Sequence, residues 1–312
     1  MMVNTGTAVF CADIGGSFIK FGLSRQQGEV TELAKLPTPA ESWDEFVLAL
    51  QTLLSNHGAS LAADTPLAIS TAGLVSPQSG EVMATNIPAF AGHNLAAELT
   101  QILKRKVSVA NDADCFALAE AHVGEGQGLP IVIGVILGTG VGGGIVINGQ
   151  LVRGHGGVAG EWGHGAITRT ELLVEGQRVT LPRLLCGCGQ TGCLDMYGGA
   201  RGMERLHLEF HQLSHSSHQI ISGWQDGNTQ CALTLEAWLQ LVSEPLALLV
   251  NIIGPSKIVV GGGLATVAPL IAALDQRLRT QTLHKYSQPL LVPGKYVNQG
   301  GLVGASVLGR QR

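Results

Sequence analysis

Apolar segments alternate with glycine turns along the first part of the chain. Residues 8–14 are apolar and end in two glycines, and the extended pattern continues at 18–23 and 29–36. Short apolar runs separated by tight turns predict three consecutive strands. Residues 42–55 repeat apolar positions at helical spacing after an initial serine, with Glu45 three residues later, which predicts a capped amphipathic helix. The same criteria predict strands at residues 66–71 and 107–110 and helices at 93–103 and 112–122.

A second unit with the same opening begins near residue 130. Residues 130–137 predict an apolar strand, 138–144 a glycine turn and 145–147 the returning strand. The alternation of strands and helices predicts an α/β fold with parallel or mixed sheets. The repeated opening predicts two related lobes that offer glycine turns to a shared cleft. Further along the chain we expect a long helix at 233–253 that is kinked or broken at Pro245, a strand at 257–260 and a short helix at 303–308.

Composition changes this picture mainly through glycine. The 312 residues include 43 glycines, clustered near the predicted turns, which is about twice the usual share. The net charge of −4 argues against a broad basic surface for nucleic acid. No uncharged apolar run approaches the ~20 residues of a membrane-spanning helix, and the N-terminus lacks the pattern of a signal peptide. We therefore expect a soluble cytoplasmic protein that binds neither nucleic acid nor membrane.

Three of the six cysteines lie within eight residues, at Cys186, Cys188 and Cys193. With glycines between them, these thiols predict a metal site rather than a disulfide framework. Tetrahedral zinc needs a fourth ligand, and His164 is the candidate that completes a Cys3His set. Two alternatives remain at this point: the cysteines are unligated, or they form a redox pair, which the absence of Cys-x-x-Cys disfavours.

The other cysteines and a group of histidines carry weaker signals. Cys11, Cys115 and Cys231 lie in apolar runs and are interpreted as buried small hydrophobic residues. His207, His211, His215 and His218 lie in a polar stretch. We interpret this stretch as a solvated helix and loop rather than a second metal site.

The two glycine turns match neither common nucleotide-binding motif. The sequence Asp13-Ile-Gly-Gly-Ser17 and the glycines of 138–144 do not fit the P-loop pattern, and neither turn fits a dinucleotide fingerprint. Such turns can present backbone N–H groups to phosphate oxygens from two sides. Asp13 is placed to hold Mg²⁺, directly or through water. The alternative is that each turn is only a tight hairpin.

Asn111 and Asp112 stand between a predicted strand and a predicted helix. A carboxylate at the carboxyl end of a strand faces the ligand crevice in open α/β sheets. Asp112 could therefore accept a proton from a hydroxyl as its oxygen attacks phosphorus. The alternative is that Asp112 is simply a helix N-cap.

Five motifs in order make the chain resemble the ROK sugar kinases along nearly its whole length. They are Asp13-Ile-Gly-Gly-Ser17, Asn111-Asp-Ala-Asp-Cys-Phe-Ala117, Leu137-Gly-Thr-Gly-Val-Gly-Gly-Gly144, Gly160-Glu-Trp-Gly-His164 and Cys186-Gly-Cys-Gly-Gln-Thr-Gly-Cys193. Within the family the chain is most similar to the bacterial N-acetyl-D-glucosamine kinases, a similarity that includes Pro37-Thr-Pro39, Thr85-Asn-Ile-Pro88 and the 21 residues between His164 and Cys186.

The resemblance implies a two-lobed actin-like ATPase fold of the ribonuclease H-like type, with the ligand cleft between its lobes. The small lobe would comprise residues 1–121, with a C-terminal helix at about 292–312 packing back on it, and the large lobe residues 122–291 with the zinc loop. The implied reaction is ATP-dependent phosphorylation of N-acetyl-D-glucosamine at its 6-hydroxyl, with Asp112 as general base. Mg²⁺ would accompany ATP, and the protein would be a homodimer.

The resemblance also assigns roles to individual residues. Sugar binding is implied for Ser70, Thr71, Gly73, Asn86, Asn111, Asp112, Glu161, His164 and Asp195. ATP binding is implied for Asp13, Gly15, Gly16, Ser17, Lys20, Gly138, Thr139, Gly140, Gly142, Gly143, Gly262 and Gly263. One structural zinc ion per chain is implied at His164, Cys186, Cys188 and Cys193, so that one nitrogen of His164 would face zinc and the other the sugar.

Two positions depart from the family pattern. Ser17 stands where the family usually has Thr, which keeps the hydroxyl. Asp195 stands where the family usually has Glu, and the shorter side chain puts the preference among sugars in question. N-acetylmannosamine and glucose are therefore alternative substrates, and a sugar sensor without catalysis is an alternative class. A transcriptional repressor of the family is disfavoured, because only twelve residues precede Asp13.

Overall fold

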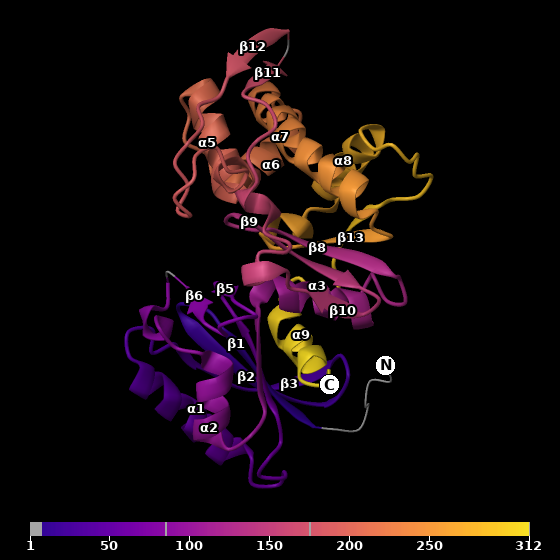
Figure 1. The fold of residues 1–312 in the computed structure, drawn as a ribbon. Helices are drawn as coiled ribbons and strands as arrows, with labels where there is room; N and C mark the ends of the chain where they lie inside the picture. The colour runs from indigo at the N-terminus through magenta and orange to yellow at the C-terminus, as the bar shows by residue number, and fades with distance from the viewer. Residues whose placement is uncertain (1–7, 85, 175, 312) are drawn as a thin grey trace. The chain divides into compact units, whose positions relative to one another are not determined.

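The computed structural model describes residues 8–84, 86–174 and 176–311 (Figure 1). The chain divides into two compact units. The first unit comprises Met1–Gly128, Gly144–Ala159 and Gln299–Arg312, and the second comprises Leu129–Gly143 and Gly160–Asn298. The segment Gly144–Ala159 thus belongs to the first unit, whereas the sequence analysis placed it in the large lobe.

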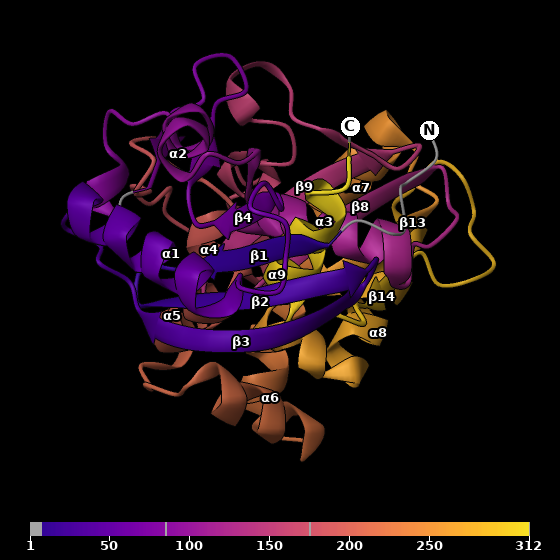
Figure 2. The same cartoon turned by 90° about the horizontal axis from the view of Figure 1, so that it is seen from below.

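The first unit is built on a five-stranded mixed sheet with the strand order β3-β2-β1-β4-β7. Three antiparallel strands lie side by side in Figure 2: β1 (Val9–Ile14), β2 (Phe18–Gln26) and β3 (Glu29–Pro37). Strands β4 (Leu67–Thr71) and β7 (Val107–Asn111) continue the sheet in parallel with β1. All five strands were predicted from the sequence, because their apolar runs are bounded by turn residues.

Four helices accompany this sheet: α1 (Trp43–His57), α2 (Leu95–Leu103), α3 (Asp112–Val123) and α9 (Gly300–Leu308). The side chain of Ser42 caps α1 by accepting from the Glu45 amide, as its sequence predicted. Helix α9 contacts α3 and strands β1 and β4. A Cβ on Gly304 of α9 would collide with the carbonyl group of Cys115 in α3, so the two backbones touch where only glycine fits.

Shorter elements complete the first unit. They are β5 (Leu74–Val75), β6 (Val82–Met83), η1 (Pro88–Phe90), β10 (Gln150–Val152) and η2 (His155–Gly157). The core is aromatic at its centre: Phe10 stacks on Phe21, and Phe46 meets the edge of Phe90. All four rings are almost fully buried.

The second five-stranded sheet has the order β10-β9-β8-β13-β14. It contains β8 (Ile131–Leu137), β9 (Val141–Ile147), β13 (Lys257–Gly261) and β14 (Leu291–Pro293), of which β8, β13 and β14 are parallel. The division between the units falls within β9. The glycine turn was expected to run to residue 144, but β9 already begins at Val141. Gly143 can enter the strand because its Cα lies against Trp162 and the Gly134 carbonyl, where a Cβ would be only 2.9 Å from each.

Helices form most of the second unit: α4 (Asp195–Gly198), α5 (Ala200–His211), α6 (Ser217–Gln225), α7 (Thr229–Ile253) and α8 (Ala268–Thr280). Helix α7 contacts α5, α6 and α8, and Figure 1 shows these helices grouped together. The other elements are η3 (Trp162–His164), η4 (Gly263–Thr266) and the hairpin of β11 (Glu171–Val174) and β12 (Gln177–Thr180).

Two expectations for this unit need correction. Of the kink or break expected at Pro245, the break does not occur, because α7 continues through that residue to Ile253. The stretch around His207 was interpreted as solvated, but His207 is fully buried. Among the described helices, α7 is long and apolar enough to cross a bilayer by length and composition. However, 67% of its most apolar window is buried within the structure, as in the core helix of a soluble protein.

Candidate active site

The carboxyl ends of three parallel strands meet at one edge of the first sheet. Asp13 on β1 pairs with Ser70 on β4, and Thr71 on β4 pairs with Asn111 on β7. Ser70 donates its hydroxyl hydrogen to Asp13 Oδ1 at 2.9 Å, and Lys20 Nζ lies 3.8 Å from Asp13 Oδ2. Burial raises the pKa of Asp13, while Ser70 and Lys20 oppose that rise. This edge therefore presents a half-buried carboxylate, the type of ligand that Mg²⁺ prefers.

The turn between β1 and β2 is held by residues outside it. Thr38 donates its hydroxyl to the Gly15 carbonyl at 2.6 Å and its amide to the Ser17 carbonyl at 3.0 Å. A Cβ on Gly16 would lie 3.0 Å from the side-chain nitrogen of Asn86, so the turn and the exposed Asn86 are in contact. The family resemblance assigned Gly16 to ATP and Asn86 to the sugar, and in the structure the two residues lie in contact. Thr85, which precedes Asn86 in the family motif, lies outside the described residues.

The end of β4 offers a ligand backbone groups rather than side chains. Ser70 and Thr71, both predicted to bind sugar, are fully buried, and the Thr71 hydroxyl donates to the Ala72 carbonyl. Gly73 has a φ of 95° and packs closely against the Met83 carbonyl. A ligand at this turn would therefore meet main-chain groups.

Asn111, not Asp112, caps helix α3. Asn111 Oδ1 accepts from the Ala113 amide at 2.8 Å and the Asp114 amide at 3.4 Å, and Nδ2 donates to the Gly73 carbonyl at 2.8 Å. Asp112 is the first residue of α3 and is exposed, with Oδ1 accepting from the Ala113 amide at 2.9 Å. The cap interpretation of Asp112 is thus wrong, and its carboxylate stands at the positive end of a helix dipole.

In the second unit, the glycine turn before β9 surrounds the carboxylate of Asp195. Asp195 Oδ1 accepts from the Val141 amide at 2.7 Å, and Gly140 packs so closely on the same oxygen that a Cβ would collide with it. Gly262 has a φ of 82°, and a Cβ on it would lie 2.8 Å from the Gly138 nitrogen. The carbonyls of Gly138 and Thr139 accept from the amides of Ala200 and Arg201 at the start of α5. The predicted residues Gly138, Thr139, Gly140, Asp195 and Gly262 therefore form one cluster.

His164 faces two different groups with its two ring nitrogens. Nδ1 lies 3.7 Å from Cys186 Sγ, and Nε2 lies 3.9 Å from Glu161 Oε2. Burial raises the pKa of Glu161, and the nearby charge of Asp195 raises it further, while His164 lowers it. Trp162 fixes this segment by donating its indole N–H to the Gly142 carbonyl at 2.8 Å. Glu161, His164 and Asp195 thus form a polar group next to the glycine turn.

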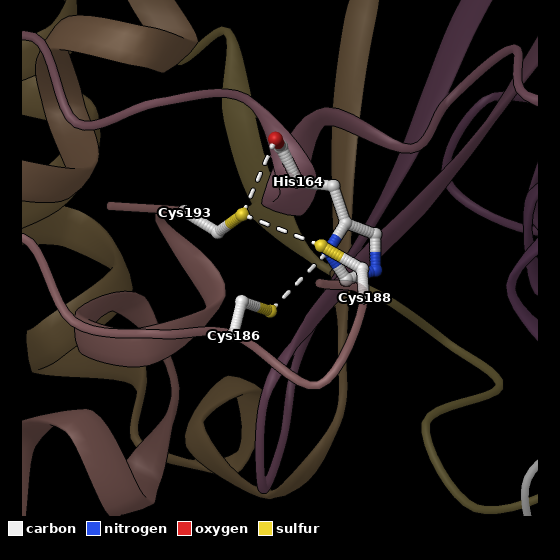
Figure 3. A group of neighbouring side chains, drawn as sticks. All are labelled: His164, Cys186, Cys188 and Cys193. Atoms are coloured by element: carbon white, nitrogen blue, oxygen red, sulfur yellow. Dashed lines mark hydrogen bonds between the residues drawn. The ribbon is translucent and has the colours of Figure 1, made fainter. Parts of the chain in front are cut away.

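The cysteine loop gathers its thiols around the same histidine (Figure 3). Cys188 Sγ lies 3.6 Å from Cys193 Sγ, and the four side chains of His164, Cys186, Cys188 and Cys193 place one ligand atom each within 4.8 Å of one another. Turns at Gly189 and Gly192, with φ of 88° and 81°, close the loop. A hydrogen bond from the Gln190 backbone lowers the pKa of Cys188 to about 7, whereas burial raises that of Cys193 to about 12.

These spacings fit a tetrahedral ion. Zinc–sulfur bonds of about 2.3 Å at a tetrahedral angle put two sulfurs about 3.8 Å apart. The observed separations of 3.6 Å between thiols and 3.7 Å between thiol and imidazole are close to that value. Three thiols and one imidazole are also a donor set that zinc prefers. The residues present therefore fit the predicted zinc site.

Sequence reasoning missed two residues that shape the first-unit site. Thr38 holds the β1–β2 turn, and the only sequence signal for it was its place in Pro37-Thr-Pro39. Gly301, at the start of α9, packs on Asp13 so closely that a Cβ would collide with its carboxylate. Residue 301 lies far from Asp13 in sequence, so only the packing of α9 reveals this contact.

Comparison with known proteins connects this geometry to a family. The ROK family matches residues 9–312. The chain belongs to the ROK family. An N-acetyl-D-glucosamine kinase from Salmonella gallinarum is 34% identical over 296 residues, which cover 95% of this chain and 97% of that protein.

Solved structures of ROK proteins share the fold. The ROK hexokinase from Thermus thermophilus superposes with a TM-score of 0.81 at 28% identity, covering 97% of this chain and 98% of the other. A ROK family glucokinase from Streptomyces griseus, solved with glucose and AMPPNP, has a TM-score of 0.73 at 27% identity and coverage of 98% and 100%. This ROK protein accordingly has the actin-like ATPase fold, as its resemblance to the family implied.

Proposed function

We propose that this ROK protein transfers the γ-phosphoryl group of Mg-ATP to the 6-hydroxyl of N-acetyl-D-glucosamine. The chain is an ATP-dependent sugar kinase. Its similarity to N-acetyl-D-glucosamine kinases, at 32–34% identity over 95% of its length, is the observation that carries the choice of substrate. The exposed carboxylate of Asp112 at the start of α3 supports the chemistry.

Asp112 is proposed as the general base. The O6–H proton passes to the Asp112 carboxylate while O6 forms its bond to the γ-phosphorus and the bond to the leaving ADP oxygen breaks. Asn111 positions this residue, since its side chain ties the first turn of α3 to the Gly73 carbonyl. A carboxylate held at a fixed helix terminus needs little reorganisation when the sugar binds.

Backbone amides and Mg²⁺ would neutralise the phosphates. The first turn contributes Gly15, Gly16 and Ser17, with Asp13 as the residue that would hold Mg²⁺ and Lys20 beside it. The second turn contributes Gly138, Thr139, Gly140, Gly142 and Gly143, and Gly262 with Gly263 would flank the adenosine. Phosphoryl transfer asks a protein mainly for this positioning and charge neutralisation.

The sugar hydroxyls are proposed to be bound by Glu161, His164, Asn111 and Asp195. The N-acetyl group is proposed to lie near Asn86 and the backbone of residues 70–73. In the described chain Asp195 Oδ1 is already occupied by the Val141 amide. Its second oxygen is therefore the one proposed for sugar. This shorter side chain leaves N-acetylmannosamine and glucose as the competing substrates within the same enzyme class.

A zinc ion held by His164, Cys186, Cys188 and Cys193 is proposed as a structural cofactor. When bound, it would fix the orientation of the His164 ring without entering the reaction. His164 Nε2, directed to Glu161, would then be held in place for the sugar.

We also propose that the enzyme works as a homodimer in the cytoplasm and binds no nucleic acid, in keeping with its net charge of −4. Light scattering during gel filtration at micromolar concentration tests the dimer. A monomer mass across the concentration range would refute it.

A coupled assay of ADP release with Mg-ATP tests the substrate. N-acetylglucosamine, N-acetylmannosamine, glucose and fructose are compared at matched concentrations, and N-acetylglucosamine is expected to give the highest kcat/KM. A higher value for another sugar would keep the kinase and overturn the substrate. Binding of sugar without ADP release by metal-loaded protein would instead favour a sensor without catalysis.

A further inference from the structure

Three histidines and one cysteine gather in the second unit, away from the cysteine loop in sequence. His207 and His211 lie one turn apart on α5, His215 follows in the loop before α6, and Cys231 lies in the first turn of α7. His207 is fully buried and Cys231 is 2% exposed. The rings of His211 and His215 both lie within 4.8 Å of the His207 ring, centroid to centroid.

The backbone is shaped to bring these side chains together. Gln212, the residue that follows α5, is in the left-handed region with a φ of 55°, and three residues later His215 stacks on His207. The Asn228 side chain caps α7 by accepting from the Cys231 amide at 2.9 Å. A Cβ on Gly223 of α6 would lie 2.6 Å from Cys231 Sγ, so a glycine at this position leaves room for the thiol.

The hydrogen bonds of His207 define which ring nitrogen carries its proton. Thr234 donates its hydroxyl hydrogen to the Gln230 carbonyl at 3.1 Å, so its oxygen accepts from His207 Nδ1 at 2.8 Å. In this tautomer Nε2 carries no proton, and its lone pair is available to a ligand. This arrangement, with one imidazole nitrogen donating to an oxygen and the other open, is typical of a metal-ligating histidine.

Three ring nitrogens of the cluster are buried without a hydrogen-bond partner among residues 8–84, 86–174 and 176–311. They are His207 Nε2, His211 Nε2 and His215 Nδ1. Buried polar atoms are rarely left unsatisfied, because each loses its bonds to water and gains none in return. Since His207 and His215 also belong to one group of closely spaced ligand atoms, their unpartnered nitrogens point to a common partner that the protein itself does not supply.

From this geometry we propose that His207, His215 and Cys231 form a second metal site, with the His211 ring packed against His207. One ligand atom from each of the three residues lies within 4.8 Å of the others. Ligand atoms around a tetrahedral ion with bonds of about 2.0–2.3 Å are about 3.3–3.8 Å apart, so binding an ion needs these separations to shorten by at most about 1–1.5 Å. Two imidazoles and a thiolate suit a borderline ion of the zinc class.

The site would cross-link α5, the α5–α6 loop and α7 within the second unit. Its argument is independent of the proposed kinase reaction, because none of its residues belongs to the candidate active site. It also differs from the cysteine loop in every ligand.

Metal content of the full-length protein tests the proposal. Wild type, C231A, H215A and C11A are equilibrated with excess Zn²⁺, desalted and analysed for zinc per chain by mass spectrometry. C231A and H215A are each expected to hold one equivalent less than wild type, and C11A, which alters an equally buried cysteine in the first unit, to hold as much as wild type. Equal zinc in wild type, C231A and H215A would overturn the site and leave the cluster as packed histidines.

Cobalt substitution separates the two sites. In C186S/C188S/C193S, which removes all three thiols of the cysteine loop, Co²⁺ should still give a thiolate charge-transfer band, and the further substitution C231A should abolish it. H215A guards against misfolding, because His215 lies on a loop and is partly exposed. A band that never forms in C186S/C188S/C193S, or that persists after C231A is added, would refute Cys231 as a ligand.

Discussion

His164 Nε2 lies 3.9 Å from Glu161 Oε2 while the opposite nitrogen of the same ring faces Cys186 Sγ. One imidazole therefore connects the cysteine loop to the group of polar side chains proposed to bind sugar. A change in the cysteine loop should therefore alter sugar binding, because the His164 ring can turn only if one of its two contacts is lost.

Cys188→Ser tests that connection. Cys188 is the exposed thiol of the loop, and its loss should lower zinc content, lower Tm by several degrees and raise the KM for sugar by about tenfold, with a smaller effect on kcat. Zinc analysis, thermal unfolding and steady-state kinetics measure these quantities. Gly187→Ala is the matched control, since a Cβ there meets no atom within 4 Å. Unchanged KM in zinc-depleted C188S would mean that the loop does not orient His164.

Asp112→Asn tests the general base. The amide cannot accept the O6 proton, so kcat should fall by about 10²–10⁴-fold while sugar affinity stays within a few-fold of wild type. Single-turnover rates with saturating Mg-ATP report the chemical step. Asp44→Asn is the control, because Asp44 is an exposed carboxylate in the first turn of α1. Wild-type rates for D112N would remove Asp112 from the mechanism.

Asn111→Ala should affect both folding and catalysis. It removes the cap of α3 and the bond to Gly73, at a cost of about 1–3 kcal/mol in unfolding free energy, and it frees Asp112 to move. Asn94→Ala removes the equivalent cap of α2, where Asn94 accepts from the Ala97 amide at 2.9 Å. The two variants should lose similar stability, but only N111A should lose kcat. Equal kcat in both would show that Asn111 acts through stability alone.

Glu98 predicts a pH dependence of stability. Partial burial raises its pKa, but the hydrogen bonds from His93 Nδ1 at 2.8 Å and from the Asn94 amide outweigh this and lower the pKa overall. A carboxylate with a lowered folded pKa stabilises the protein above its unfolded pKa and loses this contribution as pH falls through the folded value. Glu98→Gln should therefore lower the Tm at pH 7. Well below pH 4 the variant should match wild type, because there Glu98, whose unperturbed pKa is about 4.3, is protonated in both the folded and the unfolded protein. A Tm difference that does not change with pH would contradict this.

Gly304→Ala tests the close contact of α9 with α3. The added methyl group would meet the Cys115 carbonyl, so the helices must separate, at a cost of about 1–3 kcal/mol or more. Urea unfolding of G304A measures the loss. Stability equal to wild type would mean that α9 can shift without penalty.

The sequence alone determined the features that rest on local patterns. Strand runs bounded by glycine, the Ser42 cap and the spacing of Cys186, Cys188 and Cys193 were all readable, because the interacting residues are close in the chain. The motif that contains Asp112 likewise placed this residue at the start of a helix.

Tertiary structure decided which atoms meet. Asn111 caps α3 with its side chain held by the Gly73 carbonyl, in the turn after β4, which accepts from its amide. Asp195 Oδ1 meets the Val141 amide across 54 positions of sequence. His207 is buried where α7 packs against α5, a contact between segments that no local pattern around residue 207 shows. Contacts between distant segments have no local pattern, since they depend on how whole elements pack, and they settle which side chains are available for chemistry.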